Sequence, residues 1–253
     1  SYGGWTPRNG SHARYGQQVP LKWALQHSNN WISASLITTL GPQQFVGILH
    51  DFGLNNPDID RNATPVLSLG PCEVSVGEMV SAYTAFANGG VRCAPLFVTK
   101  IEDSHGNVIA KFQPLMTEVI SEDNSYRMID MMRAVIDGGT GSRLKGAYGM
   151  KGDICGKTGT TNSNSDGWFI AFTPELVSGA WVGGEDRDIH FDSTSLGQGA
   201  AAALPIWAYF MKKVYADHQL GYSDKPQFAI PKDFDFCSTS EDTDVNDIQE
   251  VYF

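Results

Sequence analysis

Two apolar runs late in the chain constrain the fold more than any other feature of the sequence. Residues 168–172 (WFIAF) and 177–182 (VSGAWV) are joined by a short turn-forming stretch, Thr173-Pro-Glu-Leu176. Such runs are typical of strands, and the short turn predicts that the two strands pair antiparallel. Neither run alternates cleanly between polar and apolar residues, so we expect both faces of the sheet to be covered.

Helical patterns account for much of the remaining chain. Apolar residues recur at helical spacing over residues 19–27, 31–40, 42–52, 75–88, 121–136 and 199–217. Ser75 and Glu78 match a capping box at the start of the fourth of these helices. Pro205 lies inside the last helix and predicts a kink there.

The other segments predict a hairpin and a loop. Residues 96–102 and 108–112 are rich in β-forming residues and are joined by DSHGN, which predicts a hairpin. Residues 54–73 include three prolines and predict a loop. Together the elements predict an α/β (α+β) domain in which helices flank an antiparallel sheet.

Charge and composition exclude several functions. The formal net charge is −10, and seven acidic residues after Lys232 account for most of it, so the rest of the chain carries −3. This near-neutral balance argues against nucleic-acid binding, which needs a basic surface. The six histidines lack metal-ligand spacing, and no two of the four cysteines have CxxC spacing, so we expect no metal.

Lys157 stands in a Gly-Lys-Thr sequence that resembles a phosphate-binding loop. Such a loop needs a glycine five residues before Gly156, where Lys151 stands instead. The polar residues that follow Lys157 would also begin a helix poorly. We therefore interpret the segment as an exposed edge strand. On such a strand Lys157 and Gly159 share one face, and Thr158 and Thr160 share the other.

On a strand, Lys157-Thr-Gly159 matches one of the motifs of serine acyl-transferases that react with penicillin. A second motif of that group, Ser-x-Asn, is matched by Ser28-Asn-Asn30 between two predicted helices. Each match is short and arises easily by chance. Taken alone, residues 28–30 are better explained as the cap of the following helix.

Longer stretches carry a more specific resemblance. Residues 138–187, which contain GGTGSRL, GKTGTTNSNSDGW and VSGAWVGGEDR, closely resemble the transpeptidase domain of class A (bifunctional) penicillin-binding proteins. Residues 5–9 (WTPRN), 21–36 (LKWALQHSNNWISASL) and 74–90 (VSVGEMVSAYTAFANGG) are also similar to that domain. The similarities follow the family's order and cover most of the chain, which implies the fold of penicillin-recognising serine transpeptidases and β-lactamases.

The resemblance implies a peptidoglycan D,D-transpeptidase that needs no metal or organic cofactor. Its catalytic residues would be Ser28, Asn30 and Lys157, and its substrate-binding residues Gly141, Thr158, Gly159 and Thr160. Ser28 would pass a proton to the leaving group, and Asn30 would hold the amide of the substrate. Thr158 and Thr160 would bind the terminal carboxylate, with the backbone N–H of Thr160 in an oxyanion hole.

The nucleophile is the point at which this sequence departs from the family. The family places Ser-x-x-Lys upstream of the stretch that residues 5–9 resemble, so we expect the attacking serine outside these 253 residues. One literal match, Ser142-Arg-Leu-Lys145, follows Ser-x-Asn instead of preceding it, and we reject it. We therefore expect this chain alone to be inactive and its parent protein to be the transpeptidase.

The resemblance also implies the organisation of the parent protein. Residues 1–218 would form a partial transpeptidase (penicillin-binding) domain, and residues 219–253 a C-terminal extension with an acidic, flexible tail. The implied partners are peptidoglycan stem peptides ending in D-Ala-D-Ala, β-lactams and the cell-wall synthesis machinery. A missing N-terminal part would supply a glycosyltransferase domain and an anchor on the periplasmic face of the inner membrane.

Two other functions remain open from the sequence. A serine β-lactamase shares the motifs, but it needs a base that activates water for deacylation, and no residue here is identified as that base. A non-catalytic sensor could use the same fold to bind cell-wall peptides. Penicillin turnover would identify a β-lactamase. Saturable peptide binding without an acyl adduct would identify a sensor.

Overall fold

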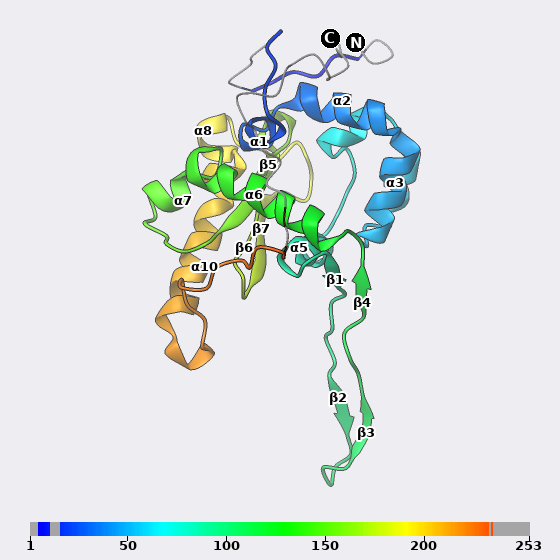
Figure 1. Cartoon of the computed structure of the whole chain (residues 1–253), viewed down its shortest axis with the longest axis vertical. Helices are drawn as coiled ribbons and strands as arrows, with labels where there is room; N and C mark the ends of the chain where they lie inside the picture. Colours follow the sequence, from blue (N-terminus) through cyan, green and yellow to red (C-terminus); the bar gives the residue numbers. More distant parts are fainter. Residues whose placement is uncertain (1–4, 11–15, 233, 235–253) are drawn as a thin grey trace.

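A three-stranded antiparallel sheet organises the computed structural model, which describes residues 5–10, 16–232 and 234 (Figure 1). Its strands are β5 (Cys155–Thr160), β6 (Asp166–Phe172) and β7 (Val177–Gly183), in the order β5-β6-β7. Trp168 lies opposite Trp181 across β6 and β7, and the turn at 173–176 joins the two strands. The antiparallel pair predicted from the two apolar runs is confirmed.

Helices cover this sheet, as expected from its poor alternation. The longer helices of the chain are α2 (Asn30–Leu40), α3 (Pro42–Asp51), α5 (Val76–Ala87), α6 (Glu122–Gly138) and α10 (Leu204–Ala216). Of these, α5, α6 and α10 pack against the sheet. Phe169 on β6 packs against Trp207 of α10, with ring centroids 5.7 Å apart. Phe172 on the same strand packs instead with residues of α6 such as Ile129. The mixed α/β class with an antiparallel sheet is therefore confirmed.

Local sequence signals explain where several helices begin. The Ser75 hydroxyl accepts the backbone N–H of Glu78, whose carboxylate accepts the N–H of Ser75, so the predicted capping box of α5 is present. Ser121 caps α6, which continues two residues beyond the predicted end. The short α1 (Leu21–Gln26) begins after Pro20.

Three prolines lie in the first turns of helices, where the sequence predicted a loop or a kink. The predicted loop over 54–73 contains α4 (Pro57–Arg61) and a 3₁₀ helix, η1 (Pro65–Leu69). Each begins with a proline, which suits the first helical position because no N–H is needed there. The predicted kinked helix over 199–217 is instead α9 (Gly199–Ala202) followed by α10, which has Pro205 in its first turn.

Several short elements were not predicted from the sequence. They are α7 (Arg143–Gly146), α8 (Thr194–Gly197), η2 (Asn162–Asn164), η3 (His218–Leu220), β1 (Val91–Cys93) and β4 (Met116–Glu118). Within the described part of the chain, no helix is long and apolar enough to cross a membrane.

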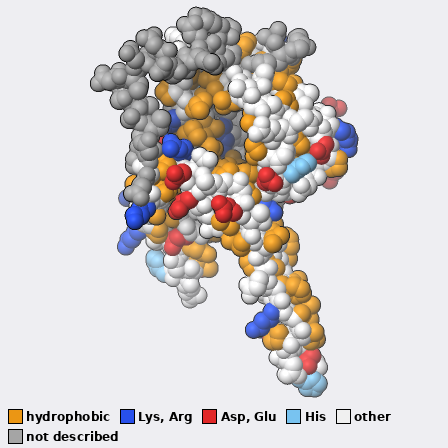
Figure 2. Space-filling model, turned by 45° about the vertical axis from the view of Figure 1, so that its right-hand side comes forward, with side chains coloured by type: hydrophobic (Ala, Val, Ile, Leu, Met, Phe, Trp, Pro, Cys, Tyr) orange, Lys and Arg blue, Asp and Glu red, His pale blue; other side chains and the backbone are white. Residues whose placement is uncertain are grey.

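A long arm, residues 91–118, projects from the body of the molecule (Figure 1). At its base β1 pairs with β4, and toward its tip β2 (Lys100–Glu102) pairs with β3 (Val108–Lys111). The predicted hairpin is therefore real but has shorter strands. The arm carries exposed apolar side chains, which Figure 2 shows along its length, and Phe97 is 93% exposed.

The segment after η3 returns to the domain and packs against it. Phe228 is buried, and its ring lies 5.6 Å from that of Phe172. Its backbone N–H donates to Asp153, which also accepts two hydrogen bonds from Arg133 of α6. This part of the predicted C-terminal extension contributes to the core, while the predicted acidic tail and Cys237 lie outside the described residues.

Candidate functional site

The candidate site forms around Lys157 in the middle of β5. This strand is paired only on its β6 side among the described residues, and Lys157 lies opposite Ile170. The Lys157 ammonium donates to the Ser28 hydroxyl at 2.8 Å and to the Thr158 carbonyl at 2.9 Å. The structure therefore brings together Ser28 and Lys157, two predicted site residues that are 129 positions apart in the chain.

Ser28 reaches Lys157 because of an unusual turn between α1 and α2. Ser28 has φ +54, a left-handed conformation that is uncommon for a residue other than glycine. The neighbouring Asn29 caps α2 by accepting the N–H of Ile32. Neither Ser28 nor Asn30 is the cap, so the capping explanation applies to the residue between them. Strained backbone of this kind is often found at functional positions.

Burial changes the acidity of Lys157. It lowers the pKa of Lys157 from 10.5 to about 8, because the surroundings disfavour the charged form. No carboxylate pairs with this ammonium among the described residues. Near neutral pH Lys157 is therefore still mostly protonated, but it gives up its proton more readily than an exposed lysine does.

An apolar cavity of about 210 Å³ opens beside Lys157. Its other lining residues come mostly from α1, α3, α5 and α6, and Lys157 is the only charged residue among them. Leu25, Phe52, Phe86 and Met132 are among the apolar ones, and burial raises the pKa of Tyr83 in the same wall to about 12. Apolar space of this size is a site for another apolar group rather than for water.

Thr158 faces a residue that the sequence analysis did not single out. Its hydroxyl donates to the hydroxyl of Thr140 at 2.6 Å. Thr140 follows α6, and its backbone N–H donates to the carbonyl of Gln26, near Ser28. The sequence shows Thr140 between two glycines in GGTG, which could have marked it as a residue of interest. That pattern does not show that its hydroxyl meets Thr158.

The other predicted residues of the strand are packed closely. Thr160 accepts the backbone N–H of Gly199 at 3.0 Å, so its hydroxyl holds the start of α9. At Gly199 a Cβ would lie 2.4 Å from the Gly159 carbonyl, so only glycine fits this approach. At Gly159 a Cβ would lie 3.0 Å from the Cβ of Trp168.

Three other residues singled out from the sequence have partners other than Lys157 in this structure. The amide of Asn30 donates to the carbonyl of Arg8 at 2.5 Å, so it binds the N-terminal segment. Gly141 is buried, and a Cβ there would lie 2.8 Å from Ile136, which gives it a packing role in this structure. Lys145, in the rejected Ser142-Arg-Leu-Lys145 match, pairs with Asp137.

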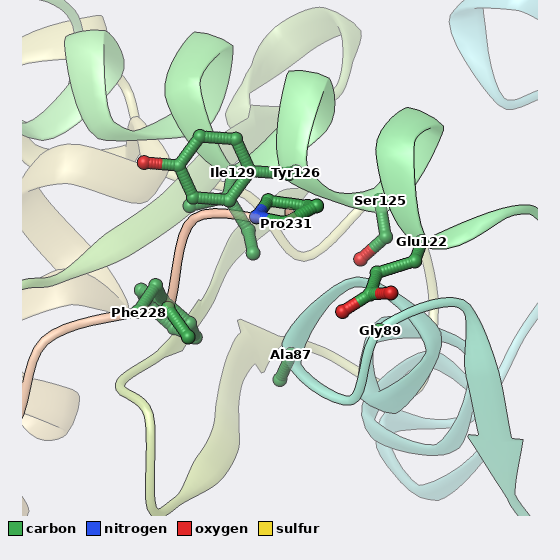
Figure 3. Close-up of a pocket in the computed structure, with 9 residues that line it drawn as sticks. Ala87, Gly89, Glu122, Ser125, Tyr126, Ile129, Phe228 and Pro231 are labelled. Carbon is green, nitrogen blue, oxygen red and sulfur yellow. The ribbon is translucent and has the colours of Figure 1, made fainter. Parts of the chain in front are cut away.

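A second, smaller pocket of about 130 Å³ lies near the N-terminal end of α6 (Figure 3). Figure 3 shows the carboxylate of Glu122 and the side chains of Tyr126, Phe228 and Pro231 around it. None of the predicted catalytic residues lines it. Among the described residues, no cluster of three or more histidine, cysteine or acidic side chains could hold a metal ion.

Comparisons with known proteins identify the family of this chain. The sequence profile described as the penicillin binding protein transpeptidase domain matches residues 1–182. Penicillin-binding protein 1A of Aquifex aeolicus is 36% identical over 213 residues, and that of Neisseria lactamica is 33% identical over 217. These alignments cover 83% and 82% of this chain, but the chain spans only 27% and 26% of those relatives.

Solved structures show the same fold. The crystal structure of penicillin-binding protein 1A from Haemophilus influenzae superposes with a TM-score of 0.77 at 26% identity, over 90% of this chain and 38% of that one. PonA1 from Mycobacterium tuberculosis in complex with penicillin V gives a TM-score of 0.68 at 22% identity, over 87% and 62% of the two chains. At 22% identity, the similarity to PonA1 shows a shared fold alone.

Proposed function

Because this chain belongs to the penicillin-binding protein transpeptidase family, we propose that it supplies the substrate-binding half of a D-Ala-D-Ala transpeptidase site. The hydrogen bond between Lys157 and Ser28 is the observation that carries the proposal. It joins two motifs from distant parts of the chain beside an apolar cavity. The parent protein would cross-link peptidoglycan stem peptides, and β-lactams would block it by mimicking the dipeptide.

The geometry supports a division of labour between Ser28 and Lys157. The hydroxyl of Ser28 accepts a hydrogen bond from the ammonium of Lys157, so the hydrogen of that hydroxyl is free to be given to a leaving amine. The positive charge of Lys157 would favour the negative charge that develops on the attacked carbonyl. Thr158 and Thr160 would bind the terminal carboxylate, and Asn30 would turn to the substrate after releasing Arg8.

The attacking serine would come from a Ser-x-x-Lys segment outside these 253 residues. The cavity beside Lys157 supports this part of the proposal, because an apolar helix face seated there would bring a serine near Ser28 and Lys157. The chain alone would then bind substrate without forming an acyl-enzyme. In the parent protein the domain would work on the periplasmic face of the inner membrane, anchored elsewhere in the sequence and linked to a glycosyltransferase domain.

Labelling with a fluorescent penicillin tests the proposal. We expect no covalent label on the 253-residue chain and stoichiometric, lasting label on the parent protein. In the parent, Lys157→Met should slow labelling about 100-fold, as expected for loss of an electrostatic contact in an active site. Lys213→Met, on an exposed position of α10, is the matched control and should label normally.

Each other outcome has a distinct meaning. Label on Ser142 of the short chain would show that the nucleophile lies within it. A parent protein that hydrolyses the penicillin and releases it would be a β-lactamase. A parent that binds a D-Ala-D-Ala peptide saturably but never forms the adduct would be a sensor.

A further inference from the structure

Thr140 lies between the two parts of the site and contacts both. Its backbone N–H donates to the Gln26 carbonyl at 3.2 Å, and Gln26 lies two residues before Ser28. Its hydroxyl accepts a hydrogen bond from Thr158 at 2.6 Å, next to Lys157 in β5. One residue after α6 therefore links the turn that carries Ser28 to the strand that carries Lys157.

The loop around Thr140 has little freedom to move. At Gly139 a Cβ would lie 2.4 Å from the Gln26 carbonyl and 2.7 Å from its Cγ, so the backbone there is pressed against the end of α1. The N–H groups of Gly139 and Gly141 both donate to the carbonyl of Val135. These contacts fix the position of the Thr140 hydroxyl relative to Thr158.

The hydrogen bond between the two hydroxyls has a consequence for anion binding. A threonine hydroxyl has one hydrogen, and Thr158 here directs its hydrogen to Thr140. Thr158 cannot donate that hydrogen to a carboxylate at the same time. If both hydroxyls rotate, Thr140 donates to Thr158 and Thr158 donates to the anion, while each oxygen keeps its own hydrogen. A hydroxyl that accepts a hydrogen bond also donates more strongly.

We propose that Thr140 is a positioning residue for the terminal carboxylate of the substrate, acting through the hydroxyl of Thr158. This inference rests on the proposed function, because it takes Thr158 to be the residue that meets the carboxylate. Thr140 itself touches no reacting atom. In the free protein it holds the Thr158 hydroxyl in one orientation. When the anion binds, the Thr140 hydroxyl donates to Thr158 while Thr158 donates to the carboxylate.

The test uses the parent protein and two probes, a fluorescent penicillin and its methyl ester, which keeps the reactive ring but lacks the carboxylate charge. Thr140→Val removes the hydroxyl and keeps the shape. We expect it to lower the acylation rate constant for the acid about tenfold, the size of a weakened hydrogen bond to a charged group. With the ester, Thr140→Val should lower the acylation rate constant by about twofold or less. Thr140→Ser, which keeps the hydroxyl, should acylate with the acid at the wild-type rate.

A double-mutant cycle shows whether Thr140 acts through Thr158. With the acid, Thr140→Val combined with Thr158→Val should be no slower than Thr158→Val alone, because the second hydroxyl has no partner left. Melting temperatures of all variants check folding, and Thr140→Ala repeats the measurement if the valine variant unfolds early.

Three results would overturn the inference. The first is an equal fall in the acylation rate constant of Thr140→Val with acid and ester, and the second is no fall with either probe. The third is a double-mutant cycle in which the effects of Thr140→Val and Thr158→Val are additive. A wild-type parent that is not labelled at all would instead contradict the proposed function, so the two failures can be told apart.

Discussion

Replacing Lys157 by methionine should stabilise the 253-residue chain near neutral pH, although it removes two hydrogen bonds. Burial lowers the pKa of Lys157 from 10.5 to about 8, and one pKa unit corresponds to about 1.4 kcal/mol. Keeping the ammonium protonated therefore costs about 3 kcal/mol, before solvent screening of this half-buried group. The lost hydrogen bonds offset part of the gain, so we expect a net increase of about 1–2 kcal/mol in the free energy of unfolding.

The stabilisation should depend on pH in one direction. Because the folded-state pKa lies below the unfolded value, the unfolded wild-type chain binds more protons between about pH 8 and about pH 10.5. Wild-type stability therefore rises with pH across this window. The variant lacks the group, so its advantage should be complete below about pH 8 and should shrink toward about pH 10.5.

Urea unfolding of wild type and variant at several pH values between about 7 and about 10.5 measures the difference directly. Lys213→Met is the control, because it makes the same change of side chain at an exposed position of α10. The reasoning would be refuted by a Lys157→Met variant that is less stable at neutral pH. A stabilisation that stays constant with pH would refute it as well, since desolvation of the ammonium would not be its cause.

Two further substitutions test the supports of the fold, each by urea unfolding. Asp153→Ala should lower the free energy of unfolding by about 3–5 kcal/mol, because it leaves Arg133 without its bidentate partner and the Phe228 N–H unpaired. Asp153→Asn should lower the free energy of unfolding by less than Asp153→Ala does. Equal decreases for the two variants would contradict the charge argument. Ser75→Ala should cost about 1 kcal/mol by removing the cap of α5, and a loss no larger than that of Ser104→Ala on the exposed arm would contradict it.

Local signals predicted the parts of the fold that local chemistry determines. The apolar runs of β6 and β7, the capping box at Ser75 and the hairpin tip all depend on residues close together in sequence. Pro57 and Pro65 predict a loop but begin α4 and η1, because proline is common both in loops and in a first helical turn. Sequence alone does not show which of the two contexts applies.

The site was predictable only in part, for a related reason. Ser28 and Lys157 were identified through motifs, and the structure confirms that they meet. Their hydrogen-bond partners follow from long-range packing, which no local pattern encodes. Thr140 reaches Thr158 because the end of α6 is pressed against Gln26. Asn30, the first residue of α2, is hydrogen-bonded to both Arg8 and Asn9 of the N-terminal segment.

The arm has a consequence for the colloidal behaviour of the isolated chain. Residues 94–99 and 112–117 include no charged side chain, and Phe97, Leu115 and Met116 are exposed. The formal net charge of −10 keeps two copies apart at low ionic strength. At physiological salt that repulsion is screened beyond about 8 Å. Added salt should therefore promote association of the isolated chains through the exposed apolar side chains of their arms.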